Sequence, residues 1–466
     1  MNLLSFLNAL AVVIFVVDDL GYNEVGFTNG ESRCTPFIDT LAGEGVILTN
    51  FYVAPDGSGT RSSLLTSRYP HTYGLNHHSL TRQEEYGLNL TIPLWSEILA
   101  QSGVDTGMFG KWHLGSHRRK YTPTYRGFKH FTGFYGGSLD YYNHDDLNGY
   151  DWFISDGADF DLTSAGRYSG ELLYEVLAEY MATRDRRQPV FLQISLQTAH
   201  HPMEMPPPII DYNVSCHYLD SEYVSSRMVY NAMMQYVDSF LQRVVRLLEQ
   251  HGITGDNSVF ALTSDGGASI SFGGGSWFRG EKGDVYEGGI RVPAVIWGRD
   301  VPHMRYGYPV HVIDLLPTLI DIAGWDVSLP NVDGVSMWDG IRWNTDVRKE
   351  ILLALDWCDC PFEYVCTNPC QCPPKPNNIS DWKVSGAIYL NGWKLILKQG
   401  RTELFRIITD PFELTDFSSE FPSVVDQLLA RMDYYLRHGS ESSKPPCNPF
   451  LVPVDNWWLP EDYFRK

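Results

Sequence analysis

Two adjacent carboxylates, Asp18 and Asp19, directly follow a Val-rich apolar run at 12–17. Such a short, β-branched run is typical of a buried strand. Carboxylates placed side by side at the end of a strand repel each other unless a cation neutralises them, which favours a hard metal ion. A pair that caps the start of a helix is the alternative, and the pattern alone leaves both interpretations open.

Two loops further along the chain carry residues that could bind an anion or transfer a proton. The segment GKWHLG at 110–115 places Lys111 and His113 two residues apart, so on an extended loop both could point into one cleft. His200 follows another apolar run and could donate a proton to a leaving group. Taken alone, each of these is more simply a solvated loop residue.

A Gly-rich segment at 263–289 adds a third carboxylate and another cation. Asp265 follows a strand-like run and could be a further metal ligand, while Lys282 could bind an anion. A Gly-rich turn without function is the simpler interpretation of each fragment.

These residues belong to an alternation of strand-like and helix-like segments over the first two-thirds of the chain. Strands are expected at 12–17, 106–110, 189–195, 258–263 and 292–297, and helices at 37–44, 61–67, 92–102, 171–184, 230–250 and 314–323. The alternation predicts an α/β sandwich around a large, mostly parallel sheet. In such a fold the catalytic groups lie on loops at the carboxyl ends of strands, which is where Asp18, Asp19, His200 and Asp265 occur.

The pattern changes beyond about Thr345, where a Cys- and Pro-rich stretch precedes a hairpin-like segment at 386–398 and a helix at 422–438. We therefore predict two domains. Residues 1–345 form the catalytic-type α/β domain, and residues 346–466 form a smaller α+β domain with an antiparallel sheet and a Cys-rich loop.

Composition excludes several classes of partner. The 466 residues are 43% hydrophobic and carry a net charge of −20 without a long basic run, which is typical of a globular protein that binds neither nucleic acid nor an anionic membrane surface. No stretch is long and apolar enough to be a stable membrane span. An anionic substrate must therefore meet a local cationic pocket.

Eight cysteines, six of them between 358 and 447, favour disulfides and an oxidising compartment over a zinc cluster, since no His lies near their Cys-x-Cys spacings. N-glycosylation triplets at Asn89, Asn213 and Asn378 agree with a secreted or lysosomal glycoprotein. Only about ten residues precede the strand at 12–17, so we expect the signal segment to be incomplete in this sequence.

In their order along the chain, these fragments resemble the sulfatase family, and its arylsulfatase B-type members most of all. The resemblance covers nearly the whole chain and is carried by DDLGY at 18–22, SSLLT at 62–66, GKWHLG at 110–115, RGF at 126–128, HHP at 200–202, SD at 264–265, RGEK at 279–282, EGGIR at 287–291, DLLPTL at 314–319, WKL at 393–395, ELF at 403–405 and DP at 410–411. It implies the fold shared with alkaline phosphatases, hydrolysis of sulfuric esters, and a bound Ca²⁺ ion.

The resemblance also implies a role for each matching residue. The calcium ligands are Asp18, Asp19 and Asp265, and the residues that hold sulfate oxygens and the aldehyde hydrate are Arg61, Lys111 and Lys282. His113 corresponds to the base that expels sulfate from a covalent intermediate, and His200 to the acid that protonates the leaving alcohol. Metal and cations then offset the charge that develops on oxygen.

Two positions depart from the family pattern. The family segment begins Cys-x-Pro-x-Arg, or Ser-x-Pro-x-Arg in some bacterial members, and its first residue becomes the formylglycine nucleophile. Counting back from Arg61 gives Gly57 at that position and Gly59 at the proline, and Gly266 stands where the family has a metal-binding Asn. Glycine has no side chain to oxidise or to bind calcium, so we expect weakened calcium binding and impaired or lost formylglycine-dependent hydrolysis.

Three functions follow from this pattern. The first is an arylsulfatase B-like homologue that binds a sulfate ester, either a small molecule or a sulfated glycan, without hydrolysing it. The second is a working sulfatase that uses Ser58 or a calcium-bound water. The third is an active sulfatase whose true chain has Cys at position 57 and Asn at position 266, the sequence being in error there.

Overall fold

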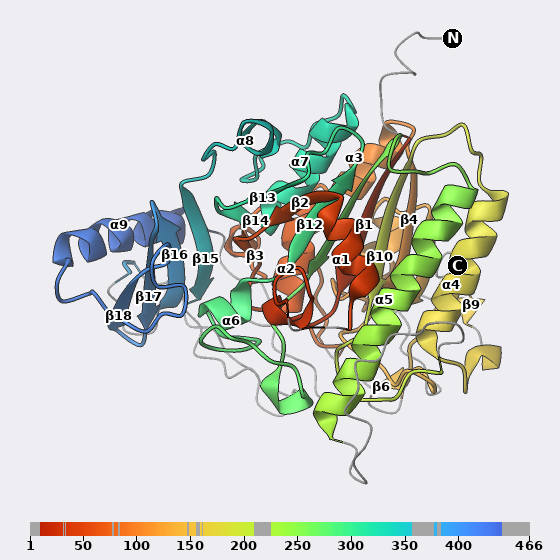
Figure 1. Ribbon diagram of the computed structural model, residues 1–466, viewed down its shortest axis with the longest axis horizontal. Helices are drawn as coiled ribbons and strands as arrows, with labels where there is room; N and C mark the ends of the chain where they lie inside the picture. The colour runs from red at the N-terminus through yellow and green to blue at the C-terminus, as the bar shows by residue number, and fades with distance from the viewer. Residues whose placement is uncertain are drawn as a thin grey trace.

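The computed structural model describes residues 10–439 apart from 31, 33, 77–78, 83, 147–148, 155–158, 161, 209–224, 357–376 and 380–383. Most of these residues belong to a large body built on one sheet, with a smaller sheet at its side (Figure 1). None of the described helices is long and apolar enough to cross a membrane.

The large sheet has ten strands in the order β13-β2-β12-β11-β1-β10-β4-β5-β8-β9. They are β1 (Ala11–Val17), β2 (Gly45–Leu48), β4 (Asp105–Lys111), β5 (His130–Phe134), β8 (Phe153–Ile154), β9 (Asp159–Phe160), β10 (Val190–Leu196), β11 (Ser258–Ser264), β12 (Ala294–Gly298) and β13 (Met304–Tyr306). Five neighbouring strands, β11, β1, β10, β4 and β5, run parallel. The predicted mostly parallel α/β sheet is confirmed.

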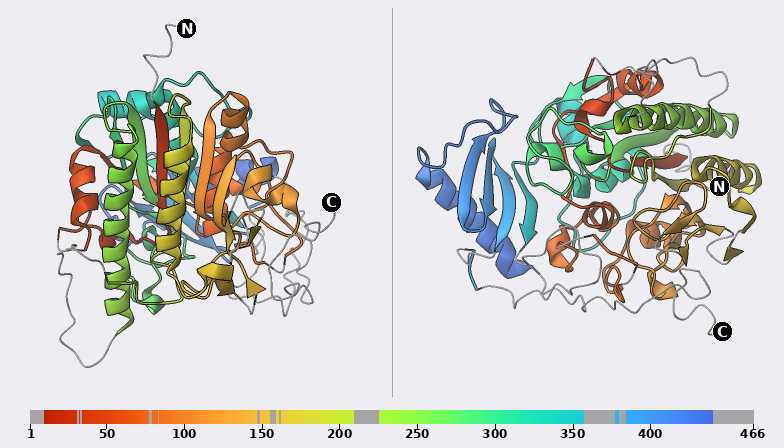
Figure 2. Two further views of the ribbon diagram at one scale, coloured as in Figure 1. Left: turned by 90° about the vertical axis from the view of Figure 1, so that its right-hand side faces the viewer. Right: turned by 90° about the horizontal axis from the view of Figure 1, so that it is seen from below.

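Helices cover both faces of this sheet because its central strands are buried on both sides (Figure 2, left). In β1, Phe15 packs with the helices of one face and Ile14 with those of the other, as the alternation of side chains along a strand requires. The first face carries α1 (Pro36–Gly43), α4 (Ser169–Thr183) and α5 (Ser226–Gln250), and the second carries α2 (Gly57–Thr66), α3 (Trp95–Gln101) and α7 (Val312–Ala323).

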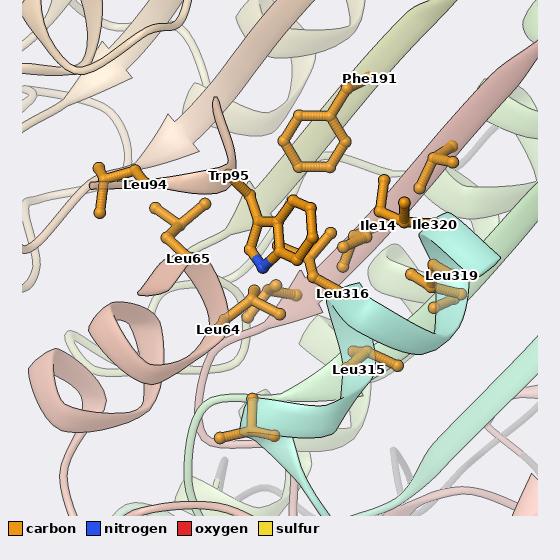
Figure 3. Close-up of a cluster of buried hydrophobic side chains, with 14 of the residues drawn as sticks. Ile14, Leu64, Leu65, Leu94, Trp95, Phe191, Leu315, Leu316, Leu319 and Ile320 are labelled. Atoms are coloured by element: carbon orange, nitrogen blue, oxygen red, sulfur yellow. The ribbon is translucent and has the colours of Figure 1, made fainter. Parts of the chain in front are cut away.

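The core on the second face holds α2 against the sheet (Figure 3). Leu64 of α2 and Leu316 of α7 pack in one cluster with Ile14. Trp95 belongs to the same cluster, and its indole Nε1 donates to the Ser67 hydroxyl 2.8 Å away at the end of α2. The carboxyl end of α2 is thereby fixed in the core, which leaves its amino end at the loops that follow the parallel strands.

Several elements differ from the predicted ones in their starts or direction. Helix α2 begins at Gly57 rather than at 61, because Asp56 caps it by accepting a hydrogen bond from the Gly59 amide. Helix α3 begins at Trp95 rather than at 92, since a residue before proline disfavours the helical conformation. The strand expected at 292–297 is β12, which runs antiparallel to both neighbours.

The predicted antiparallel sheet near the C-terminus is confirmed, and Figure 2 (right) shows it beside the large body. It consists of β15 (Glu350–Asp356), β16 (Ser385–Leu390), β17 (Trp393–Lys398) and β18 (Arg401–Arg406), and α9 (Pro422–His438) packs on it. The other short elements are β3 (Phe51–Tyr52), β6 (Asp145–Asp146), β7 (Gly149–Tyr150), β14 (Val310–His311), α6 (Glu287–Ile290) and α8 (Trp338–Trp343). The domain boundary at 345/346 stays a prediction.

Cys34 is disulfide-bonded. The other seven cysteines lie outside the described residues, as does the triplet at Asn213. Asn378 is exposed and Asn89 is half-buried.

A buried ion cluster joins the small sheet to the large body. Lys394 on β17 is fully buried, and its Nζ lies 2.9 Å from Glu287 Oε1 of α6 and 2.8 Å from Glu413 Oε1. Tyr52 of β3 donates its hydroxyl to Glu287 Oε2 at 3.1 Å. Since α6 closely follows the loop that carries Lys282, this cluster also helps to position that loop.

Replacing Lys394→Met should leave the carboxylates of Glu287 and Glu413 buried together without their cation. We expect the free energy of unfolding to fall by about 3–5 kcal/mol, measured by urea denaturation. The control Lys398→Met, at the exposed end of the same strand, should change it by less than about 0.5 kcal/mol. Equal midpoints for both variants would contradict this account of the cluster.

Candidate functional site

The residues expected to carry chemistry come together at the carboxyl ends of the parallel strands. Asp18 follows β1, Lys111 ends β4, His200 follows β10 and Asp265 follows β11. These four strands are consecutive in the sheet, so their ends lie side by side. The site is completed by α2 and by the loop before α6.

Three carboxylates are paired with three cations at this edge. Arg61 of α2 donates from Nε to Asp265 Oδ2 at 2.9 Å, and its Nη2 lies 2.8 Å from the same oxygen. Lys111 Nζ lies 2.7 Å from Asp18 Oδ2, and Lys282 Nζ lies 2.7 Å from Asp19 Oδ2, so each carboxylate has a cation of its own.

Backbone contacts hold the carboxylates in place. Asp19 has a φ of 55°, which turns the chain sharply after β1, and its amide donates to Asp265 Oδ1 at 3.2 Å. The Ser264 hydroxyl accepts from the Leu20 amide and donates to the Val17 or Gly266 carbonyl. The ends of β1 and β11 are therefore tied together where their carboxylates meet.

Burial sets the protonation of this cluster. It raises the pKa of Asp18, with the Asp265 charge adding to the effect, and it raises the pKa of Asp19 despite the Lys282 ammonium. Burial would also raise the pKa of Asp265, but Arg61, Lys111 and Lys282 together hold it far below its usual range. Asp265 is thus the most acidic of the three carboxylates.

His113 is a neutral imidazole with one free nitrogen. Its Nε2 lies 2.8 Å from the Leu80 carbonyl, which can only accept, so Nε2 carries the proton. Burial, followed by the charges of Lys111 and Arg61, lowers its pKa well below the usual value. Its Nδ1 is buried and has no hydrogen-bond partner among the described residues, which makes it a candidate proton acceptor.

The unprotonated nitrogen of His200, Nε2, faces the carboxylate of Asp19. Nδ1 lies 2.7 Å from the His201 carbonyl and must donate to it, which leaves Nε2 as the acceptor, 3.7 Å from Asp19 Oδ2. Burial, then Lys282 and Lys111, lowers the pKa of His200 well below the usual value. The expected acid role therefore requires protonation at Nε2, which this environment opposes.

Gly57 and Gly266, which the resemblance places at the nucleophile position and at a metal-ligand position, both face the cluster. A Cβ built on Gly57 would lie 2.9 Å from Asp265 Oδ2 and 3.6 Å from His113 Nδ1. A Cβ built on Gly266 would lie 3.8 Å from Asp19 Oδ1. A side chain at either position would point among the carboxylates.

Ser58 has a hydroxyl that is already engaged elsewhere. It is fully buried, donates to the His113 carbonyl at 2.9 Å and accepts from the Leu80 amide at 2.9 Å. Its proton therefore has no base to receive it, because a backbone carbonyl does not take up a proton. These contacts argue against Ser58 as a nucleophile.

Asp18 and Asp19 could hold a divalent cation together with His200, whereas both oxygens of the expected ligand Asp265 already accept hydrogen bonds, from the Asp19 amide and from Arg61. One oxygen or nitrogen from each of Asp18, Asp19 and His200 lies within 4.8 Å of the others, and all three residues are buried. Asp18 Oδ1 is a buried oxygen without a hydrogen-bond partner among the described residues. The ammonium groups of Lys111 and Lys282 compete for the remaining oxygens, which lowers the expected affinity.

Some residues at the site were not foreseen from the sequence. The His201 ring lies 4.0 Å from the His200 ring and 4.7 Å from Phe272, which is 40% exposed, so these rings form one rim of the site. Tyr141 donates its hydroxyl to the His200 carbonyl at 2.8 Å. Its position next to His200 in the sequence was a signal for His201, whereas nothing in the sequence linked Tyr141 to the site.

Comparisons with known proteins agree on one family. The family model described as Sulfatase matches residues 11–325. The chain is 29% identical to arylsulfatase J of Mus musculus over 98% of this chain and 81% of the relative. It is 28% identical to N-acetylgalactosamine-6-sulfatase of Mus musculus over 67% of this chain and 62% of that protein.

Solved structures share the fold. The crystal structure of Ps i-CgsB in complex with k-i-k-neocarrahexaose superposes with a TM-score of 0.76 at 24% identity, covering 94% of each chain. That of BT4656 in complex with its substrate D-glucosamine-2-N,6-O-disulfate gives 0.65 at 18% identity, over 94% of this chain and 100% of the other.

Proposed function

The chain belongs to the sulfatase family, and from this premise we propose that its site binds the sulfate group of a sulfated sugar without formylglycine-dependent hydrolysis. One observation carries the proposal: the chain enters α2 at Gly57, beside His113 and Asp265, with no side chain that could attack sulfur. The cations around that position remain.

The retained cations support binding of a sulfate monoester. Lys282 has a side chain that is 33% exposed, so it can meet an anion at the surface, while Lys111 and Arg61 are almost fully buried behind it. The neutral His113 adds no positive charge but leaves Nδ1 toward position 57. The three carboxylates balance these three cations, so a bound divalent cation would give the site net positive charge.

We propose that Ca²⁺ is the cation and that Asp18, Asp19 and Asp265 hold it. Calcium tolerates variable coordination, so the lack of a side chain at Gly266 weakens binding without excluding it. When bound, the ion supplies positive charge toward a sulfate oxygen.

Loss of the nucleophile should remove most of the rate. In enzymes that act through a covalent intermediate, removing the nucleophile leaves only what binding and electrostatic stabilisation provide. Ser58 does not replace it, because both its donor and an acceptor site are occupied by backbone groups. Turnover would therefore need water as the attacking group.

The sugar assignment rests on relatives and structural neighbours. N-acetylgalactosamine-6-sulfatase is named for a sulfated sugar, the structure of BT4656 contains D-glucosamine-2-N,6-O-disulfate, and that of Ps i-CgsB contains k-i-k-neocarrahexaose. We further propose that this chain is a secreted or lysosomal glycoprotein. The disulfide of Cys34 and the exposed Asn378 triplet support that location.

The purified protein, with added calcium, should not hydrolyse 4-nitrophenyl sulfate above the rate of its Lys111→Ala variant. The reason is that neither Gly57 nor the engaged Ser58 offers a nucleophile. Release of 4-nitrophenol is followed by absorbance, with the variant reporting contaminating sulfatase. Turnover that is present in the wild type and lost in the variant would contradict the proposal that the site binds sulfate without hydrolysing it. It would indicate that water is the attacking group.

Calcium should stabilise the fold more at pH 7.5 than at pH 5. Since the pKa values of Asp18 and Asp19 are raised, protons compete with the metal at a higher pH than for ordinary carboxylates. Without calcium the trend is opposite, because the folded chain holds protons that the unfolded chain releases, so these two residues lower stability as pH rises above about 4.

The measurement is the free energy of unfolding with and without calcium at each pH. Calcium at a hundredfold excess over its Kd should add about 2.7 kcal/mol, and Asp19→Asn should abolish most of that gain. An equal gain at both pH values, or full retention of it in Asp19→Asn, would exclude these carboxylates as ligands.

A further inference from the structure

A nitrogen donor lies among the carboxylates of the candidate cation site. Nε2 of His200 is 3.7 Å from Asp19 Oδ2, and one donor atom from each of Asp18, Asp19 and His200 lies within 4.8 Å of the others. Two ligand atoms that share a zinc ion, each about 2.1 Å from it, are at most about 4.2 Å apart. The imidazole and the Asp19 carboxylate are therefore spaced to hold one ion between them.

The His200 ring is held in the form that a metal ion needs. Its Nδ1 donates to the His201 carbonyl at 2.7 Å, so the free lone pair is on Nε2, the nitrogen that faces Asp19. The Tyr141 hydroxyl donates to the His200 carbonyl at 2.8 Å and fixes the backbone of this residue. Metal-binding histidines usually donate their other ring N–H to a carbonyl or a carboxylate in this way, which sets the tautomer and the orientation of the ring.

The part of the chain that the structure describes offers calcium few oxygen donors at this place. Asp265 Oδ1 accepts from the Asp19 amide and Asp265 Oδ2 accepts from Arg61, so both oxygens of that carboxylate are engaged. Gly266 has no side chain to add. Calcium prefers about six to eight oxygen ligands, whereas a zinc ion is commonly held by about three protein ligands, often including histidine, with water in the remaining position. The donors at this site match the second pattern.

A free carboxylate oxygen indicates where a cation would bind. Asp18 Oδ1 is buried and has no hydrogen-bond partner among the described residues, the nearest guanidinium nitrogen of Arg61 being 4.0 Å away. The ammonium groups of Lys111 and Lys282 contact the other oxygen, Oδ2, of Asp18 and of Asp19. The Lys282 side chain is 33% exposed, so its ammonium can turn toward solvent when a metal ion takes its place at Asp19.

We infer that His200 is a metal ligand in this chain, and that together with Asp18 and Asp19 it binds Zn²⁺ more tightly than Ca²⁺. Imidazole nitrogen suits zinc and its neighbours among the transition metals, whereas calcium is suited to oxygen ligands. The inference rests on the proposed function in that it names a ligand of the cation in the same site, and calcium then binds where no transition metal is available. A metal-bound Nε2 cannot protonate a leaving group, which agrees with binding without hydrolysis.

Calorimetric titrations of the full chain, freed of metal by a chelator, test this assignment with Zn²⁺ alone and with Ca²⁺ alone. The wild type should bind one Zn²⁺ at least about tenfold more tightly than Ca²⁺. His200→Ala should weaken Zn²⁺ binding by at least about tenfold and leave Ca²⁺ binding within about threefold of the wild type. The matched control His201→Ala removes the neighbouring ring but keeps the carbonyl that accepts from Nδ1, and it should change neither affinity.

X-ray absorption at the zinc edge observes the ligand itself. Scattering from one imidazole ring should be present in the zinc-loaded wild type and in His201→Ala, and it should be absent in His200→Ala. Circular dichroism checks that each variant folds. His200→Gln, which keeps most of the side-chain volume but has no imidazole, replaces His200→Ala if the smaller residue unfolds the chain.

The outcomes separate this assignment from the proposed function. Zn²⁺ binding that is no tighter than Ca²⁺ binding, Zn²⁺ affinity that is unchanged in a folded His200 variant, or a zinc spectrum without imidazole scattering overturns the assignment. Methyl sulfate titrated into the calcium-loaded wild type tests the proposed function. Its binding upholds that function even if His200 is no ligand, and its failure to bind overturns the function while the zinc results still decide the ligand.

Discussion

Arg61 and Asp265 form an ion pair whose side chains are each 1% exposed, and the other charges of the site are arranged around it. A buried pair of this kind requires both partners to be held in place, because losing one leaves an uncompensated charge. Arg61 comes from α2 and Asp265 from the end of β11, so the pair joins helix to sheet. Lys111 and Asp18 extend the same constraint to β4 and β1.

This constraint gives a physical reason for the close approach at Gly57. Asp265 Oδ2, fixed by Arg61, lies 2.9 Å from the position of a Cβ on residue 57, so any side chain there requires the carboxylate to move. Gly57 does not have a positive φ, and its backbone conformation therefore does not itself demand glycine. The charge cluster is thus closed around a position without a side chain, which agrees with the proposed binding of sulfate without hydrolysis.

Much of this arrangement could be predicted from the sequence, and the limits have physical causes. The apolar runs that became β1 and β11 predicted both strands and the placement of Asp18 and Asp265 at one edge, because parallel strands end together. The direction of β12 could not be predicted, since an apolar run does not specify whether its neighbours run parallel. The start of α2 was missed because the apolar pattern begins only at Leu64, although Asp56 was available as a cap.

Three features of the site depend on contacts that residue types and spacing do not reveal. The engagement of Ser58 depends on the His113 carbonyl and the Leu80 amide, and the tautomer of His200 depends on a backbone carbonyl. The cavity that the small sheet forms with the loop of Lys282 depends on how two separate sheets pack. None of these can be deduced from residue types and spacing.

Binding without hydrolysis is tested most directly by a crystal structure of the protein soaked with a stable sulfate monoester and calcium. We expect an intact ester whose sulfate lies against Lys282 and Lys111 in front of Gly57, with every protein side chain unmodified. A sulfate covalently attached to the chain, or a site that stays empty at saturating ester, would contradict it.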